Sequence, residues 1–128
     1  MAALSNYLEN ALINATLRNT SYTSPTTVYV GLFLSDPTDA GSGTECSGGS
    51  YSRKAITFGA PSNGVSVNSA AVEFDQATAN WGTVTHFGIL DASTSGNLLY
   101  HGALTASKVI DDGDVFKFAI SAVSVTLA

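Results

Sequence analysis

The sequence is short of charged residues. Only 12% of its 128 residues are Asp, Glu, Lys or Arg, compared with about 25% in an average globular protein. Its five basic residues form no dense cationic patch and its net charge is −5, so we expect no binding to nucleic acid or to an anionic membrane surface. Serine and threonine, with 16 and 14 residues, fill the gap. A surface with so little like-charge repulsion favours the packing of subunits in an assembly.

Cysteines and long apolar runs are also scarce. Cys46 is the only cysteine, so no disulfide can form within the chain, and its Gly/Ser-rich surroundings, GSGTECSGGS, indicate an incidental loop thiol. No run of about 18 apolar residues occurs, which argues against a membrane span. The first 19 residues lack the basic and apolar regions of a signal peptide. We therefore expect a protein that is made in a cytoplasm and stays soluble.

One amphipathic helix is predicted near the start of the chain, over residues 4–19. Apolar residues recur there at spacings of three and four and so share one stripe: Leu4, Tyr7, Leu8, Ala11, Leu12 and Ala15. Asn19 suits the left-handed conformation that closes many helices. A helix this short is marginal alone and must dock its stripe, either on the sheet of its own domain or on a neighbouring subunit.

The remainder, residues 26–128, has the composition of a β-domain. Short segments rich in β-branched and aromatic residues, such as TVYVGLFLSD, are separated by Gly, Asn and Asp turns. The loop over residues 36–51 is longer than most connections in compact domains and is a candidate arm or binding loop. In the last segment the apolar side chains change phase after Ile120, which predicts a β-bulge near Ser121–Ala122.

These features predict the fold class. We expect a single domain over residues 1–128 that is mainly β, with one N-terminal amphipathic α-helix. The architecture is either an antiparallel β-sandwich, jelly-roll-like, or a partly closed barrel.

The stretch WGTVTHFGILDASTSGNLLYHGAL, residues 81–104, contains the only tryptophan and both histidines. The turn sequence DASTSG predicts a β-hairpin, and pairing Leu90 with Asn97 makes the numbers of facing residues sum to 187. His86 then faces His101 directly. The opposite face forms the expected core: Phe87, Ile89, Leu98, Tyr100 and Leu104.

Two facing histidines suggest a metal site or acid–base catalysis. A zinc site needs three or four ligands, however, and no carboxylate or thiol stands at a fixed short spacing to complete it. Neither H-E-x-x-H nor G-x-S-x-G occurs. We therefore predict no catalytic residue, no metal ligand and no cofactor, and we interpret His86 and His101 as a polar pair at a subunit interface or half-exposed on the sheet. A small metal-dependent enzyme that uses both histidines is the remote alternative.

Three further residues are candidate partner contacts. Arg53 and Lys54 follow the long loop and suit ion pairs with an acidic partner surface, the alternative being solvated strand residues. Trp81 suits an aromatic anchor in an interface, the alternative being a core position.

Nearly the whole chain resembles a family of small virion structural proteins of tailed bacteriophages, often labelled tail-fibre-like. The resemblance is carried by LSNYLENALINATLRNT, TVYVGLFLSDPTDAGSGTE and GGSYSRKAITFGAPSNG, then by the stretch over residues 81–104 and a closing β segment. It implies a protein without enzymatic activity that is made in the host cytoplasm and located in the virion.

Compactness and low charge then favour one role within the virion. We expect a capsid decoration, or cement, protein that binds and stabilises the shell. It would be a homo-oligomer, trimer or dimer, with capsid or other virion proteins as partners. The alternative is a tail-fibre, adaptor or receptor-binding module, whose exposed loops would contact host glycans.

Overall fold

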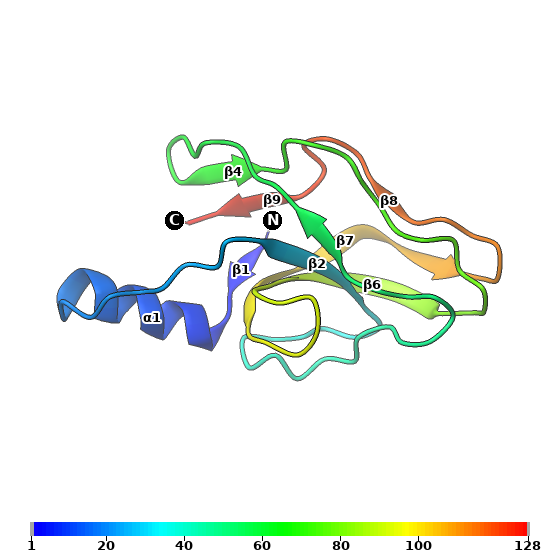
Figure 1. The fold of residues 1–128 in the computed structure, drawn as a ribbon, viewed down its shortest axis with the longest axis horizontal. Helices are drawn as coiled ribbons and strands as arrows, with labels where there is room; N and C mark the ends of the chain where they lie inside the picture. The colour runs from blue at the N-terminus through cyan, green and yellow to red at the C-terminus, as the bar shows by residue number, and fades with distance from the viewer. Residues whose placement is uncertain (1, 128) are drawn as a thin grey trace.

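Antiparallel strands in two layers build the molecule (Figure 1), in a computed structural model that describes residues 2–127. One layer is a five-stranded sheet with the strand order β1 (Ala3–Leu4), β7 (Leu98–Ile110), β6 (Gly82–Leu90), β2 (Val28–Phe33) and β3 (Lys54–Ile56). The other layer holds two short pairs, β4 (Val65–Val67) with β9 (Ser124–Thr126), and β5 (Val72–Glu73) with β8 (Lys117–Phe118). The predicted mainly-β fold with antiparallel sheets and an N-terminal helix is confirmed, and the sheets do not close into a barrel.

The core lies between the two layers. The five-stranded sheet contributes Val30, Leu32, Val84, Phe87 and Ile89. Opposite them, Phe74, Phe116 and Phe118 meet edge to face, with ring centroids 4.9–6.4 Å apart. Burial of this apolar surface is the main force that holds the short strands of the second layer on the sheet.

Helix α1 (Asn6–Leu17) is shorter than the predicted 4–19. Leu4 lies in β1, where it pairs with Tyr100, and Ser5 becomes the N-cap, its hydroxyl accepting a hydrogen bond from the Leu8 amide. Asn19 has φ 54°, as expected of a closing residue. The helix starts later than predicted because a strand pairing takes the backbone groups of its first residues.

The predicted stripe on α1 faces inward, with Leu8 buried and Leu12 half-buried. Beyond this first part, the helix extends away from the sheets, and the following segment runs back beside it (Figure 1). Two apolar side chains off the stripe, Ile13 and Leu17, are 53% and 80% exposed. The helix therefore docks in cis along one face and leaves its other face uncovered.

The end of the chain differs from the predicted single strand with a bulge. β8 and β9 pair with different partners, and between them the Ala122 amide donates to the Ala119 carbonyl at 3.1 Å while Ser121 takes φ 65°. The prediction of a β-bulge near Ser121–Ala122 is wrong, because a tight turn moves the chain from one short pair to the other. Val123 and Val125 are buried beyond the turn, as they would be beyond a bulge, whereas Ile120 and Leu127 are exposed. The phase change alone therefore could not separate a turn from a bulge.

The predicted hairpin register is also wrong. His86 lies opposite Ala103, and His101 lies opposite Gly88, so the numbers of facing residues sum to 189 in this part of the hairpin. The turn closes by pairing Leu90 with Leu98, and an irregularity next to that pair shifts the register once more. The two histidines therefore share a face but do not face each other.

The same irregularity moves Leu98 out of the predicted core face. Leu98 belongs to a second apolar cluster with Phe33 and Leu90, whereas Phe87 and Ile89 lie in the main core. The sheet thus has an apolar patch on its second face, and this patch is the floor of the candidate site.

Candidate functional site

The loop after β2 covers the second face of the sheet. Its returning half runs antiparallel to the end of β2, with the Leu34 amide donating to the Thr44 carbonyl at 2.7 Å and the Cys46 amide donating to the Leu32 carbonyl at 2.9 Å. Pro37 is buried in its first half. The long loop is therefore folded against the domain instead of projecting from it.

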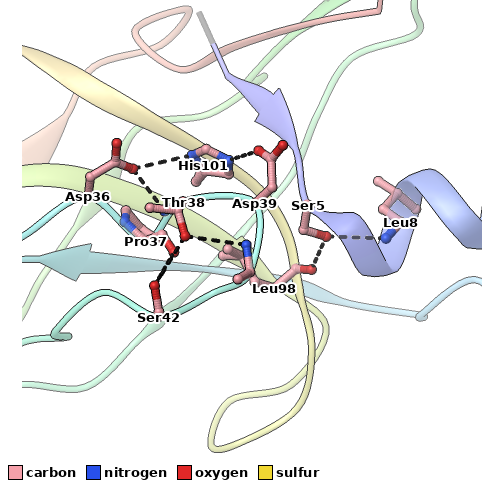
Figure 2. A network of polar contacts seen from close by, with 10 residues as sticks. Ser5, Leu8, Asp36, Pro37, Thr38, Asp39, Ser42, Leu98 and His101 are labelled. Carbon is pink, nitrogen blue, oxygen red and sulfur yellow. Dashed lines mark hydrogen bonds and ion pairs between the residues drawn. The ribbon is translucent and has the colours of Figure 1, made fainter.

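His101 fastens this loop to β7 (Figure 2). Its Nε2 lies 2.8 Å from Oδ1 of Asp39 and its Nδ1 lies 3.7 Å from Oδ1 of Asp36, with the side chain 12% exposed. His86 is half-buried elsewhere on the sheet, with its Nδ1 2.8 Å from the Thr85 hydroxyl. Residues 2–127 contain no group of three or more His, Cys, Asp or Glu side chains placed to hold a metal ion. The structure thus gives the two histidines separate partners.

Arg53 joins the loop to the turn between β6 and β7. Its guanidinium forms a bidentate pair with Glu45, at 2.9 Å from Nε to Oε2 and 2.8 Å from Nη2 to Oε1. Its Nη1 donates to the carbonyls of Ala92 and Ser95, both at 2.8 Å. The hydrogen bond with Glu45 raises the pKa of Arg53. Because the side chain is only 10% exposed, these internal contacts account for Arg53 in the isolated chain.

The other two candidate partner contacts lie in different surroundings. Lys54 Nζ is 2.9 Å from Oδ1 of Asp75 in a partly exposed pair. Trp81 is 3% exposed, packs edge to face on Tyr51 at 5.3 Å between ring centroids, and donates from Nε1 to the Gly49 carbonyl at 2.8 Å. Trp81 is therefore a core residue that also holds the end of the long loop.

A cleft of about 540 Å³ opens beside these contacts. Its walls are the start of α1, the loop over residues 39–45 and the turn over residues 95–97, and its floor is the apolar cluster of Phe33, Leu90 and Leu98. Two glycines make room for this floor: Gly31 and Gly88 pair in adjacent strands, and a Cβ on Gly88 would lie 2.8 Å from side-chain atoms of both Phe33 and Leu98. The cleft itself depends on segments distant in sequence and was not predicted.

The buried thiol gives a pH-dependent prediction. Burial, and after it the neighbouring Glu45 carboxylate, raises the pKa of Cys46 from 9.0 to about 11. Between these two pKa values the Cys46 thiol therefore stays protonated in the folded protein but has lost its proton in the unfolded chain. The free energy of unfolding is unaffected by this group below pH 9 and falls as the pH rises from 9 to 11. We expect the difference in unfolding free energy between wild type and Cys46→Ala to narrow from pH 8 to pH 10.5. Urea denaturation of both proteins at both pH values measures this difference in unfolding free energy. A difference that stays the same at pH 8 and pH 10.5 would contradict the burial of the thiol.

Comparison with known proteins identifies the family. No helix among residues 2–127 has the length and apolar character needed to cross a membrane. No curated protein matches the sequence, whereas one family model matches residues 3–126. This match confirms the resemblance to phage virion structural proteins and the expected location in the phage particle. Since it spans almost the entire sequence, the chain belongs to the family described as Podophage GP4 fiber I protein gp80.

Proposed function

We propose that the protein is a non-enzymatic fibre component of the phage particle that binds other virion proteins and associates with further copies of itself. The description of its family as a fibre protein supports the assignment to a fibre. The uncovered face of α1 supports the association with other copies or other virion proteins. His101 and Arg53 are the polar side chains best suited to catalysis or ligand binding. Both instead form contacts that hold the long loop. A structural role accounts for them without a reaction.

The observation that carries the proposal is the outer face of α1, which we define by its exposed residues Glu9, Asn10, Ile13, Thr16 and Leu17. On a helical wheel these side chains lie opposite the inward stripe that contains Leu8. Full burial of an exposed side chain of this kind stabilises by about 1.5–3 kcal/mol. Leu17, 80% exposed, would gain most of this at a partner surface, and Ile13, 53% exposed, about half. A partner surface is the place where that burial is available.

A second copy of α1 fits this face in an antiparallel arrangement. Glu9 lies in the first turn and Arg18 directly follows the helix. Arg18 is exposed and lies off the outer face, with its Nη1 donating to Oδ1 of Asn14 at 3.2 Å, so the two antiparallel copies bring Glu9 of each near Arg18 of the other when that side chain leaves Asn14 and turns toward the partner. Ile13 of both copies then lies at the crossing point, and each Leu17 packs over the partner's helix. The opposite charges at the two ends favour this register and disfavour the parallel one, in which like charges meet. We therefore favour a dimer over a trimer for the isolated chain.

Placing a charge on the outer face should abolish the self-association. In Leu17→Asp the two copies would have to bury a carboxylate without a partner. We expect wild type to show a concentration-dependent mass between monomer and dimer in analytical ultracentrifugation, and Leu17→Asp to remain monomeric. Val109→Asp, which changes another exposed apolar residue (52% exposed) on β7, is the matched control and should behave as wild type. Equal association of all three proteins would exclude α1 as the interface.

The predicted register has its own test. Glu9→Arg or Arg18→Glu alone should weaken association, since each brings like charges together, whereas the double variant Glu9→Arg/Arg18→Glu should restore it. If the double variant associates no better than the single ones, the antiparallel arrangement is wrong.

Capsid decoration is the second candidate, favoured by the low surface charge and the folded loops. Copy number separates the two roles. Quantitative mass spectrometry of purified particles, referenced to the major capsid protein, should give at most tens of copies for a fibre component. A count in the hundreds would overturn the fibre proposal in favour of a shell protein.

A further inference from the structure

We propose that the turn before β4 is a site of spontaneous covalent modification, at which Asn63 loses ammonia and becomes isoaspartate or aspartate. Asn63 and Gly64 form the only asparagine–glycine pair in the sequence, and both residues are exposed. This inference does not depend on how the chain is assembled. It involves none of the residues that form the outer face of α1 or line the cleft.

The reaction needs only the peptide itself and water. The Gly64 amide nitrogen bonds to Cγ of the Asn63 side chain, and its proton passes to the side-chain nitrogen, which leaves as ammonia from the cyclic succinimide. Water then opens the ring. Attack at the main-chain carbonyl gives isoaspartate, in which the backbone runs through Cβ and Cγ, whereas attack at Cγ gives aspartate. Glycine hinders this ring closure least, because it has no Cβ beside the attacking nitrogen.

The turn is closed at its base but leaves the reacting groups without hydrogen bonds. Ser62 and Val65 exchange backbone hydrogen bonds at 2.9 and 3.0 Å, and Asn63 and Gly64 between them take φ of 52° and 77°. Within residues 2–127, neither the Gly64 amide nor the Asn63 side chain forms a hydrogen bond. No hydrogen bond therefore has to break before the Gly64 nitrogen loses its proton.

A second junction of the same general kind provides a contrast. Asp112 precedes Gly113 in another exposed turn, with Gly113 at φ 94°. The Gly113 amide, however, donates to the Ala77 carbonyl at 2.7 Å. Ring closure at this junction would first have to break that hydrogen bond. The structure thus predicts different reactivity at two glycine junctions that look alike in the sequence.

Isoaspartate should loosen the strand pair beside the turn. The Gly64 carbonyl accepts from the Leu127 amide at 2.8 Å at the end of β9 (Figure 1), and a Cβ on Gly64 would lie 2.5 Å from the Leu127 carbonyl oxygen. The additional methylene of isoaspartate lengthens a hairpin turn that holds only two residues, so it should disturb this close approach.

Hydrogen exchange measures that effect. The Leu127 amide should exchange faster in the purified isoaspartate form than in fresh protein. Asn63→Asp is the control, because it adds the charge without the methylene, and it should leave the exchange of Leu127 close to that of fresh protein. Equal exchange in fresh protein and the isoaspartate form would overturn the predicted effect on the β4–β9 pair.

Peptide mapping by mass spectrometry tests the modification itself. We would incubate the purified full-length chain at mildly alkaline pH, where an amide loses its proton more readily, and follow each asparagine by the gain in mass from NH₂ to OH. Labelling with an isoaspartyl methyltransferase separates isoaspartate from aspartate. Asn63 should react at least about tenfold faster than the exposed Asn10 and Asn19, a barrier difference of about 1.4 kcal/mol.

Asp112→Asn is the matched variant, because it places the same pair of residue types beside a bonded amide. In the folded protein its junction should react about tenfold more slowly than Asn63, which corresponds to one hydrogen bond of about 1.4 kcal/mol. In urea, where neither glycine amide is held, the two junctions should react alike.

Each outcome decides. Faster reaction at Asn63 than at the junction in Asp112→Asn, in the folded protein alone, supports the assignment. Equal rates in the folded protein, faster reaction at another asparagine, or an Asn63 that stays intact while the urea-denatured chain reacts overturns it. The fibre proposal stands or falls separately, since its readouts are self-association through Leu17 and copy number in the particle.

Discussion

Replacement of Asn68 by alanine should lower the free energy of unfolding by about 4 kcal/mol, one of the two largest single effects that we expect in this molecule. Asn68 is completely buried. Its side-chain amide donates to the carbonyls of Ala70 and Ala119, and its side-chain carbonyl accepts from the Val123 amide, each at 2.9 Å. Alanine would leave the Val123 amide unpaired in the interior, at about 1–3 kcal/mol. It would also take one hydrogen bond from each of the carbonyls of Ala70 and Ala119, at about 0.5–1.5 kcal/mol for each bond, although the Ala119 carbonyl keeps the Ala122 amide.

The effect should be specific to this buried network. Asn10→Ala changes an exposed asparagine of α1 and should shift stability by less than about 0.5 kcal/mol. Asn68→Asp is close in shape but brings a carboxylate to two carbonyl oxygens, so it should be as harmful as alanine above the pKa of an aspartate. Urea denaturation followed by tryptophan fluorescence of Trp81 gives all three values. A loss under 1 kcal/mol in Asn68→Ala would show that the turn after β8 does not depend on this side chain.

Replacement of Glu45 by alanine should cost about 3 kcal/mol. The change would leave the Arg53 guanidinium, 10% exposed, without its counter-charge, which is expensive in a partly buried site. It would also remove the acceptor of the Tyr51 hydroxyl, 2.6 Å from Oε2. That hydroxyl in turn accepts from the Leu32 amide in β2, so the loss should spread to the strand beneath the loop.

The exposed ion pair on the neighbouring residue provides the control. Lys54 and Asp75 form one bond of 2.9 Å with side chains 29% and 58% exposed, and pairs of this kind contribute at most about 1 kcal/mol. Lys54→Ala should therefore change stability by less than about 1 kcal/mol under the same denaturation conditions. Similar losses in Glu45→Ala and Lys54→Ala would mean that the Glu45–Arg53 pair is an ordinary surface contact.

The elements with a strong local signal were predictable. The spacing of Leu8 and Leu12 predicted the helix and its inward face, and the runs of β-branched residues predicted an antiparallel β fold. Their boundaries were less accurate, since Leu4 joins a strand whose partner, Tyr100, lies far away in the sequence. Periodicity reports which face of an element is apolar, but long-range pairing decides where that element stops.

The site was the least predictable part. Arg53 and Lys54 are adjacent in sequence and carry the same charge, yet Arg53 joins the long loop to the β6–β7 turn and Lys54 forms an exposed ion pair. The difference arises because only Arg53 lies within reach of both the loop and the turn. The two histidines were separated by a register shift of two residues that arises at the turn. Leu98, next to the turn, changes face, but from Tyr100 onward the shift preserves the alternation of faces, so no sequence pattern reveals it.

The central claim is that the protein is a fibre component held by the outer face of α1. A map of the phage particle at a resolution that shows secondary structure tests this claim most directly. We predict density for the two-layered β-domain within a fibre attached to the tail, with α1 packed through Ile13 and Leu17 against another copy or a neighbouring virion protein. Density for the domain on the capsid shell, or a fibre in which the outer face of α1 meets only solvent, would contradict the account.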